Sequence, residues 1–436
     1  MICDNISTEN SHLYFAGYDT CELAKKYGTP LMLFDRERFL NNVDTYKNAM
    51  KKAFGENSFP LYAGKALCFT HLYRVLNKTG IGIDVVSSGE LFTALSGGFP
   101  ADKIFFHGNN KTDDDIHFGV SVGIGYFVCD NEDELLQISK EASAQNTTQN
   151  ILIRLTPSVD AHTHSAIATG KLDSKFGVAI ETGDAEKLIK KALTLPNISL
   201  CGFHSHIGSQ IFSPEPFQIA ARVMADFIIH LKKTLDFDTK ILNLGGGIGV
   251  KYLESDPDVS IPDIIERVGL TLNLIFSEAS LPLPQILMEP GRSLVADCGM
   301  TLYSVGAVKE IEGVKNYVSV NGGMADNPRY ALYSAPYTVV LANRMNEKCD
   351  WKCTVAGRCC ESGDIIQENV SIPRPNRADV LAVLTTGAYN YSMSSNYNRL
   401  PKPPIVELSR EGDKVVVRRE TLKDLLNCDV VLEIKE

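Results

Sequence analysis

Several features are missing from this sequence, and each absence excludes a class of protein. No block of basic residues stands out and the net charge is −10, so a nucleic-acid-binding role has no electrostatic basis. No apolar run approaches the length of a membrane span. The first residues contain no basic segment followed by an apolar core, so we expect no secretory signal peptide. No repeat of fixed period is visible.

The eleven cysteines form no disulfide framework: their number is odd, and no CxxC pair occurs. The adjacent Cys359 and Cys360 cannot easily bridge to each other. We therefore expect reduced thiols and a cytoplasmic protein. The rest of the composition is that of a globular chain, with 44% hydrophobic and 22% charged residues. Its 436 residues suit two domains.

Eight short apolar runs alternate with stretches of helical character. Residues 130–143 and 215–235 have apolar side chains at helical spacing, and Asp130 is a candidate N-cap. This alternation predicts an α/β fold, a (β/α)8 barrel of the TIM type. The runs are 60–67, 81–90, 103–110, 124–131, 151–157, 200–209, 240–249 and 285–292.

Nearly every run ends in polar residues able to bind a ligand or to react. Active sites of such barrels lie at the carboxyl ends of the strands, so we expect these residues to gather there. They are Asp84, His107, Asn109, Arg154, His206, Gly245–Gly247, Glu289 and Arg292.

From about Asp297 the runs become short, β-branched and bounded by turns, which predicts an all-β domain. Residues 28–35 could pair with it. We therefore place the barrel at 37–296 and the β domain at 1–36 and 297–436.

Lys65 lies within the apolar segment Leu61–Leu67. One interpretation is that its side chain extends from the end of a strand into water. The other is that its amine is covalently occupied, because an isolated buried ammonium is costly.

Gly245–Gly247 follow an apolar strand, and three successive glycines leave backbone N–H groups open to an anion. Val250 stands where the third glycine of a dinucleotide-binding fingerprint would fall, and no GK[ST] follows, so neither that motif nor a P-loop is present. A phosphate site and a glycine turn formed for packing both remain open.

His204 and His206 are two residues apart, so we expect both to point to one face of a strand. A metal site would need a third ligand, and the only other tight pair is His162 and His164. We expect no metal, and interpret the segment as an imidazole facing a flat ring, with Ser209 donating to a phosphate.

Glu289 could pair with Arg292, or it could keep a pyridine nitrogen protonated. A lysine at a strand end, an anion cradle, a stacking histidine and a carboxylate for a ring nitrogen are what pyridoxal phosphate requires. Lys65 would then bind the cofactor covalently.

Long uninterrupted motifs resemble the fold type III pyridoxal-phosphate-dependent decarboxylases, which have an alanine racemase-like fold. The resemblance covers nearly the whole chain and is strongest to the members that convert meso-2,6-diaminopimelate to L-lysine, the final step of lysine biosynthesis. The motifs are YAGKA, GIDVVSSGEL, FHGNNKT, VDAHTHSAIATGKLDSKFGV, GFHSHIGSQIF, LNLGGGIG, MEPGRS, VNGGMADNPRYALY, CCESGD and TGAYNYSMSSNYN.

The resemblance implies roles for individual residues. Lys65 would hold the cofactor, His206 would stack on its ring, and Cys360, supplied by the neighbouring subunit of a homodimer with shared active sites, would be the proton donor. The other implied cofactor-binding residues are Asp84, Ser209, Gly246, Gly247, Glu289, Gly291, Arg292 and Tyr389. The implied substrate-binding residues are Arg292, Arg329, Tyr333, Glu361 and Tyr389.

Substrate choice is partly visible in the sequence. Arg329 can bind a carboxylate bidentately and Glu361 can bind a distant ammonium, which favours diaminopimelate. Gly64, Ser88, Asn321, Tyr330 and Pro336 depart from the residues common in this family. A decarboxylase of carboxynorspermidine, ornithine or lysine is the alternative enzyme, and a pyridoxal phosphate-binding protein without turnover is the alternative class.

Overall fold

The computed structural model describes residues 2–159, 175–430 and 432. The chain forms two compact units. The barrel unit comprises Leu40–Val250 and Pro257–Leu294, and the sheet unit comprises Met1–Phe39, Lys251–Asp256 and Val295–Glu436. In the part of the chain that is described, no helix has the length and apolar character needed to cross a bilayer.

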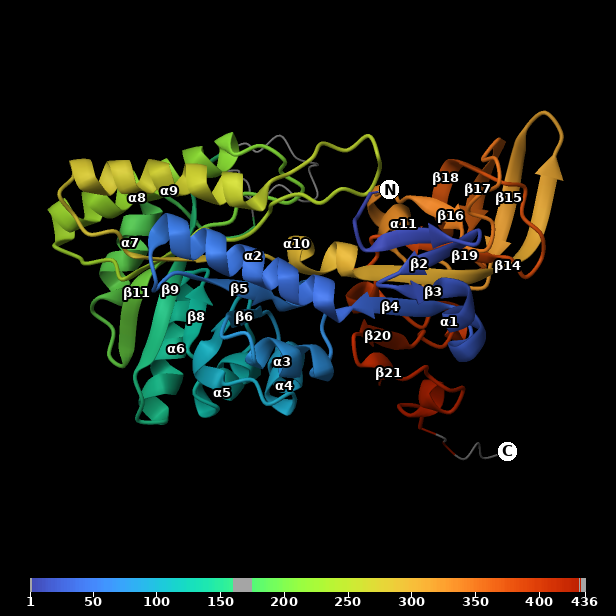
Figure 1. Cartoon of the computed structure of the whole chain (residues 1–436). Coiled ribbons are helices and arrows are strands. Elements are labelled where there is room, and N and C mark those ends of the chain that lie inside the picture. Colours follow the sequence, from blue (N-terminus) through green and yellow to red (C-terminus); the bar gives the residue numbers. More distant parts are fainter. Residues whose placement is uncertain (1, 160–174, 431, 433–436) are drawn as a thin grey trace. The chain divides into compact units, whose positions relative to one another are not determined.

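Eight parallel strands close into a ring in the barrel unit (Figure 1). Each strand pairs with the next, and the eighth pairs with the first. The TIM-type barrel predicted from the eight apolar runs is confirmed. The strands are β5 (Phe59–Ala63), β6 (Gly82–Val85), β7 (Ile104–Phe106), β8 (Tyr126–Cys129), β9 (Gln149–Thr156), β11 (Ile198–His204), β12 (Ile241–Asn243) and β13 (Gln285–Met288), and the short β10 (Val178–Ala179) pairs in parallel with the end of β9.

Helices lie outside this ring (Figure 1). The helical stretches predicted at 130–143 and 215–235 correspond to α6 and α8. The described helices are α2 (Arg36–Phe54), α3 (Thr70–Asn77), α4 (Ser88–Ser96), α5 (Asp113–Ser121), α6 (Glu132–Ala144), α7 (Asp184–Ala192), α8 (Glu215–Leu235), α9 (Ile261–Glu278) and α10 (Arg292–Val295).

Helix α6 is capped by a different residue from the one predicted. The side chain of Asn131 accepts the N–H of Glu134 at 3.0 Å, so Asn131, and not Asp130, is the N-cap. Asp130 instead accepts the N–H of Gly177 at 3.0 Å. The Asp130 carboxylate, which follows β8, therefore binds the backbone of the segment after β9 and does not cap α6.

One layer of buried side chains fills the barrel. Seven strands each contribute one residue, and on β6 the residue paired with Leu61 is Gly82, where a Cβ would lie 2.5 Å from the Leu61 side chain. The barrel is thus a packed core, and chemistry is confined to the strand ends. The layer consists of Leu61, Phe105, Val128, Leu152, Cys201, Ile241 and Leu287.

The sheet unit is built around β4 (Leu31–Asp35), which pairs antiparallel with β14 and parallel with β20. The prediction that residues 28–35 join the C-terminal strands is confirmed. The helix α1 (Thr20–Tyr27) was not predicted. The remaining elements are β1 (Ile6–Glu9), β2 (His12–Phe15), β3 (Tyr18–Asp19), β14 (Gly299–Ile311), β15 (Lys315–Val320), α11 (Arg329–Tyr333), β16 (Val339–Leu341), β17 (Trp351–Ala356), β18 (Ile365–Ile372), β19 (Val380–Leu384), β20 (Ile405–Ser409) and β21 (Gly412–Val417).

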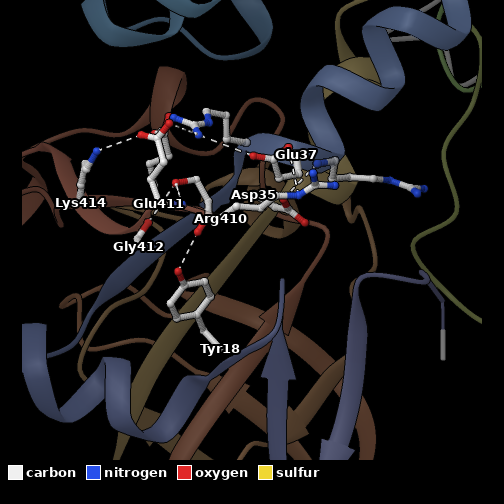
Figure 2. Close-up of polar contacts among 11 residues, drawn as sticks. Tyr18, Asp35, Glu37, Arg410, Glu411, Gly412 and Lys414 are labelled. Atoms are coloured by element: carbon white, nitrogen blue, oxygen red, sulfur yellow. Dashed lines mark hydrogen bonds and ion pairs between the residues drawn. The ribbon is translucent and has the colours of Figure 1, made fainter.

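Figure 2 shows how the β20–β21 turn is tied to the N-terminal segment of the same unit. The Tyr18 hydroxyl donates to the backbone carbonyl of Ser409 at 2.7 Å. Nε of Arg410 lies 3.9 Å from Oε2 of Glu37. Exposed ion pairs of this kind contribute little, so the hydrogen bond and the β4–β20 ladder carry most of the attachment.

Candidate active site

Lys65 follows the first barrel strand, in the single 3-10 turn Gly64–Ala66. Its side chain is exposed although both neighbours are buried, as expected for a side chain that extends from the end of a strand into water. It lies within electrostatic range of Asp84, Glu90 and His206. An accessible amine at the carboxyl end of a barrel strand is placed for chemistry.

Gly64 packs against the neighbouring strand. Its N–H donates to Oδ1 of Asp84 at 3.2 Å. A Cβ at this position would lie 2.7 Å from the Tyr73 hydroxyl and 2.8 Å from the carbonyl oxygen of Asp84, distances that real Cβ atoms do not adopt. This close packing accounts for glycine where the family commonly has serine.

Glu289 follows β13 and is held by side chains from three other strands. Nδ2 of Asn243, the last residue of β12, donates to Oε1 at 2.6 Å. Nε2 of His204, the last residue of β11, lies 3.0 Å from Oε2. Nε2 of His107, directly after β7, lies 2.7 Å from Oε1 without hydrogen-bond alignment. The protein itself therefore fixes the orientation of this carboxylate.

Burial and mutual contacts shift the pKa values of these groups, so that some are neutral and others are ionised. Burial lowers the pKa of His204 to about 4 and also lowers the pKa of His107, so both imidazoles are neutral at pH 7. The pKa of Glu289, which burial alone would raise, is held well below its ordinary value by these two histidines. Burial and the nearby Glu289 raise the pKa of Asp84 well above its ordinary value. Two carboxyl groups shifted in opposite directions are typical of a functional site.

Strand β11 ends at His204, so His206 lies beyond it. The prediction that both histidines point to one face of a strand is wrong, because His204 contacts Glu289 whereas Nδ1 of His206 accepts the N–H of Gly246 at 3.3 Å. Burial, and then the charge of Lys65, lower the pKa of His206 well below its ordinary value. A neutral imidazole that accepts at Nδ1 carries its proton on Nε2.

His204 does have companions able to bind a metal. The ligand atoms of His107, His204 and Glu289 lie within 4.8 Å of one another, so the expectation that no third ligand accompanies His204 is wrong. The other pair, His162 and His164, lies outside the described residues. A carboxylate oriented by two imidazoles can equally accept a hydrogen bond from a protonated ring nitrogen.

The three-glycine loop has a backbone that favours glycine. Gly245 and Gly247 have φ values of +65° and +123°, and a Cβ on Gly246 would lie 2.1 Å from the carbonyl oxygen of Glu289. Two of the three glycine N–H groups of this loop have partners within the protein. The N–H of Gly245 donates to Oδ1 of Asn243 at 3.0 Å, and that of Gly246 is used as described above. Only Gly247 has an N–H without a partner among the described residues.

Ser209 and Arg292 meet on the same rim. The buried Arg292 donates through Nε and Nη2 to Oγ of Ser209, at 3.2 and 2.9 Å. A hydroxyl that accepts two N–H groups still has its own proton to donate. The adjacent Gly291 packs on Ala63, where a Cβ would lie 2.9 Å from the Ala63 Cβ.

Arg329, Tyr333 and Tyr389 come together in the sheet unit. Arg329 begins α11 and is 8% exposed. Its guanidinium carbon lies 5.1 Å from the centroid of the Tyr389 ring and 5.4 Å from that of Tyr333. Its Nε is buried without a hydrogen-bond partner in the described part of the chain. A guanidinium packed on aromatic rings, with a donor unused, is suited to bind a carboxylate.

The adjacent thiols of the sheet unit lie in different environments, and all eleven cysteines are free. Cys360 is exposed and its N–H donates to Oδ1 of Asn398 at 2.6 Å. Cys359 is buried, which raises the pKa of its thiol to about 11, and its N–H donates to Asp364 at 2.7 Å. The next residue, Glu361, is exposed. The loop therefore presents Cys360 and Glu361 at its surface.

Sequence reasoning missed Asn243, and it missed the contact of His204 with Glu289. Both residues end barrel strands and both contact Glu289. The signal that singled out the other strand-end residues, a polar side chain closing an apolar run, also applies to Asn243.

Residues 40–296 match the pyridoxal binding domain of pyridoxal-dependent decarboxylases. Diaminopimelate decarboxylase of Halalkalibacterium halodurans is 42% identical over 421 residues, which cover 97% of this chain and 96% of that one. The Bacillus subtilis enzyme is 40% identical with the same coverage. A crystal structure of diaminopimelate decarboxylase from M. jannaschii is similar with a TM-score of 0.92, at 35% identity and 98% coverage of both chains, and a second was determined with L-lysine.

The matched domain contains Lys65, the glycine loop and Glu289 with its donors. Identity near 40% extends through the sheet unit, which carries Arg329 and Cys360. The chain therefore belongs to the diaminopimelate decarboxylase family, within the fold type III pyridoxal-phosphate-dependent decarboxylases.

Proposed function

We propose that this chain removes one carboxylate of meso-2,6-diaminopimelate as carbon dioxide and forms L-lysine, the final step of lysine biosynthesis. The observation that carries the proposal is the ionised Glu289 carboxylate, held by neutral donors at the same barrel rim as the accessible amine of Lys65. L-Lysine, the expected product, is the molecule named with the M. jannaschii enzyme.

The strand-end residues fit pyridoxal phosphate. Glu289 offers an anion for the ring nitrogen, His206 a neutral ring for stacking, and Lys65 an amine for covalent attachment. The N–H of Gly247 has no partner among the described residues, and Ser209 has a hydroxyl proton to donate to a phosphate. When bound, this cofactor supplies the electron sink that decarboxylation requires.

The remaining proposed contacts follow the family pattern. Asp84 accepts the N–H of the residue before Lys65 and so helps to shape the attachment turn. We propose that Asp84, Gly246, Gly291, Arg292 and Tyr389 complete the cofactor site. The substrate would be bound by Arg292, Arg329, Tyr333, Glu361 and Tyr389, with the guanidinium of Arg329 on the carboxylate at its far end.

The proton that replaces the lost carboxylate needs a general acid, and Cys360 is the exposed thiol of its loop. We propose that it serves the neighbouring subunit of a cytoplasmic homodimer, so that each active site draws on two chains. In this arrangement a domain of residues 37–296 binds the cofactor, and residues 1–36 and 297–436 complete the site.

Carbon dioxide release from a panel of amino acids tests the proposed function. We expect rapid release from meso-diaminopimelate, with L-lysine as product, and little from L-lysine, L-ornithine or carboxynorspermidine. Faster release from any of these three would replace the proposed substrate. If the chain binds the cofactor and releases carbon dioxide from none of them, it would instead be a binding protein without turnover.

A further inference from the structure

Asn243 joins two parts of the barrel rim that the proposed function uses separately. Its side chain is fully buried at the end of β12. Nδ2 donates to Oε1 of Glu289 at 2.6 Å, while Oδ1 accepts the N–H of Gly245 at 3.0 Å. We propose that Asn243 is a positioning residue that fixes the Glu289 carboxylate relative to the glycine-rich loop. The group that binds the ring nitrogen of the cofactor and the group that binds its phosphate then keep a fixed relative position.

The geometry of an amide suits this task. Its planar group donates on one side and accepts on the other, and both functions are used here. With His204 on Oε2 and Asn243 on Oε1, both oxygens of Glu289 are held. Neither contact adds a net charge to the pocket, because both partners are neutral.

The hydrogen bond that Asn243 donates to Glu289 also affects whether the ring nitrogen of the cofactor is protonated. This part of the inference rests on the proposed function, which places Glu289 at the ring nitrogen. In a buried pair, the proton can reside on the ring or on the carboxylate, and donors to the carboxylate favour the ionised form. The charged and titratable groups facing Glu289 are His107, His204, His206, Asp84 and Arg154. Asn243 adds a donor whose protonation does not change with pH.

The first test replaces Asn243 by leucine, which has a similar size and neither polar function. With cofactor labelled with 15N at the ring nitrogen, we expect the 15N chemical shift to move toward the unprotonated value. Loss of the bond to Gly245 should weaken cofactor binding, and kcat should fall by about 10- to 100-fold, as for other residues that orient a functional group. KM should change much less than kcat.

The matched control is Gln149→Leu. Gln149 is also a buried barrel amide and donates to backbone carbonyls, including that of Ile124 at 3.3 Å, but it lies at the amino end of β9. Its replacement should destabilise the chain without moving the 15N shift. If both variants moved the shift equally, or neither did, the assignment of Asn243 would be overturned.

A second variant, Asn243→Asp, keeps an acceptor for Gly245 and places a second carboxyl group beside Glu289. Two carboxyl groups this close share one proton, so the variant should gain an ionisation well above the ordinary carboxyl range. Protonated, the new group donates to Glu289 as the amide does; ionised, it repels Glu289. We therefore expect near wild-type kcat at low pH and loss as pH rises.

A loss that is independent of pH, or no loss at all, would contradict a donor role for Asn243. Glu289→Gln separates this inference from the proposed function. If that variant leaves the 15N shift unchanged, Glu289 does not face the ring nitrogen and the proposed function fails. If Glu289→Gln moves the shift and Asn243→Leu does not, only the role of Asn243 fails.

Discussion

The guanidinium of Arg329 lies 5.1 Å from the ring centroid of Tyr389, and its Nε is buried without a hydrogen-bond partner among the described residues. Aromatic rings stabilise the positive charge but leave the N–H groups to be satisfied by an anion. The proposed function supplies the far carboxylate of diaminopimelate, which lysine lacks. Substrate choice would then depend on one side chain.

Replacing Arg329 by alanine should remove most of the preference for meso-diaminopimelate over L-lysine. We expect a loss of about 2–5 kcal/mol in kcat/KM for the dicarboxylate, as for truncating one partner of a buried charge pair. Arg329→Lys should recover only part of it, because an ammonium cannot form the planar fork. Cofactor absorbance should persist in both variants.

Arg419→Ala is the matched control for this experiment. Arg419 is a half-buried arginine of the same unit, and Nη2 donates to the carbonyl of Pro30 at 2.7 Å. Its loss should affect stability and leave the substrate preference unchanged. If Arg329→Ala kept a near wild-type kcat/KM for meso-diaminopimelate, Arg329 would not bind the far carboxylate.

A shared active site predicts complementation between two inactive chains. Lys65→Ala lacks the attachment point and Cys360→Ala lacks the proton donor, but a mixed dimer of the two has one complete site. Random exchange should restore up to about a quarter of wild-type activity, because about half the dimers are mixed and each has one intact site. The measurement is carbon dioxide release after the chains have been mixed and allowed to exchange.

Cys359→Ala is the control for the thiol, because Cys359 is buried and its neighbour is exposed. This variant should retain activity by itself. Absence of rescue between Lys65→Ala and Cys360→Ala, when exchange has been demonstrated with tagged chains, would show that each chain completes its own site.

Asp326 should make stability depend on pH. It is buried, the Tyr303 hydroxyl donates to it, and burial raises its pKa to about 7. An unfolded aspartate titrates near 3.9, so between about pH 4 and pH 7 the folded chain holds a proton that the unfolded chain has released. The contribution of Asp326 to stability is therefore complete below pH 4 and decreases as pH rises to 7.

The variant Asp326→Asn should abolish this dependence. Relative to wild type, its free energy of unfolding should increase by up to about 4 kcal/mol between pH 4 and pH 8, at about 1.36 kcal/mol per pKa unit. The amide also loses the bond from the N–H of Gly323, but this cost does not change with pH. Parallel stability curves for the two chains would show that Asp326 is ionised throughout.

The strand positions and their polar ends were predictable because both are local patterns. The apolar run before Lys65 and the run before Glu289 each correspond to a barrel strand. The contacts of Glu289 were not predictable in the same way. They join residues from β7, β11 and β12, and which strands adjoin depends on closure of the barrel and on register.

Two local alternatives left open by the sequence depend on the folded chain. Lys65 could extend into water or be covalently occupied, and in the 3-10 turn after β5 its side chain is exposed while Gly64 and Ala66 are buried. The three glycines could bind an anion or form a packing turn, and Asn243 occupies the N–H of Gly245. Side chains distant in sequence decide which donors remain for a ligand.

The most direct test of the account is to locate the cofactor. The purified chain, loaded with pyridoxal phosphate and reduced with borohydride, should carry the cofactor on the peptide that contains Lys65, as mass spectrometry of a digest would show. The control is Lys65→Ala, which should retain no reducible cofactor. Label on a different lysine, or a wild-type chain that remains colourless with added pyridoxal phosphate, would contradict the proposed site.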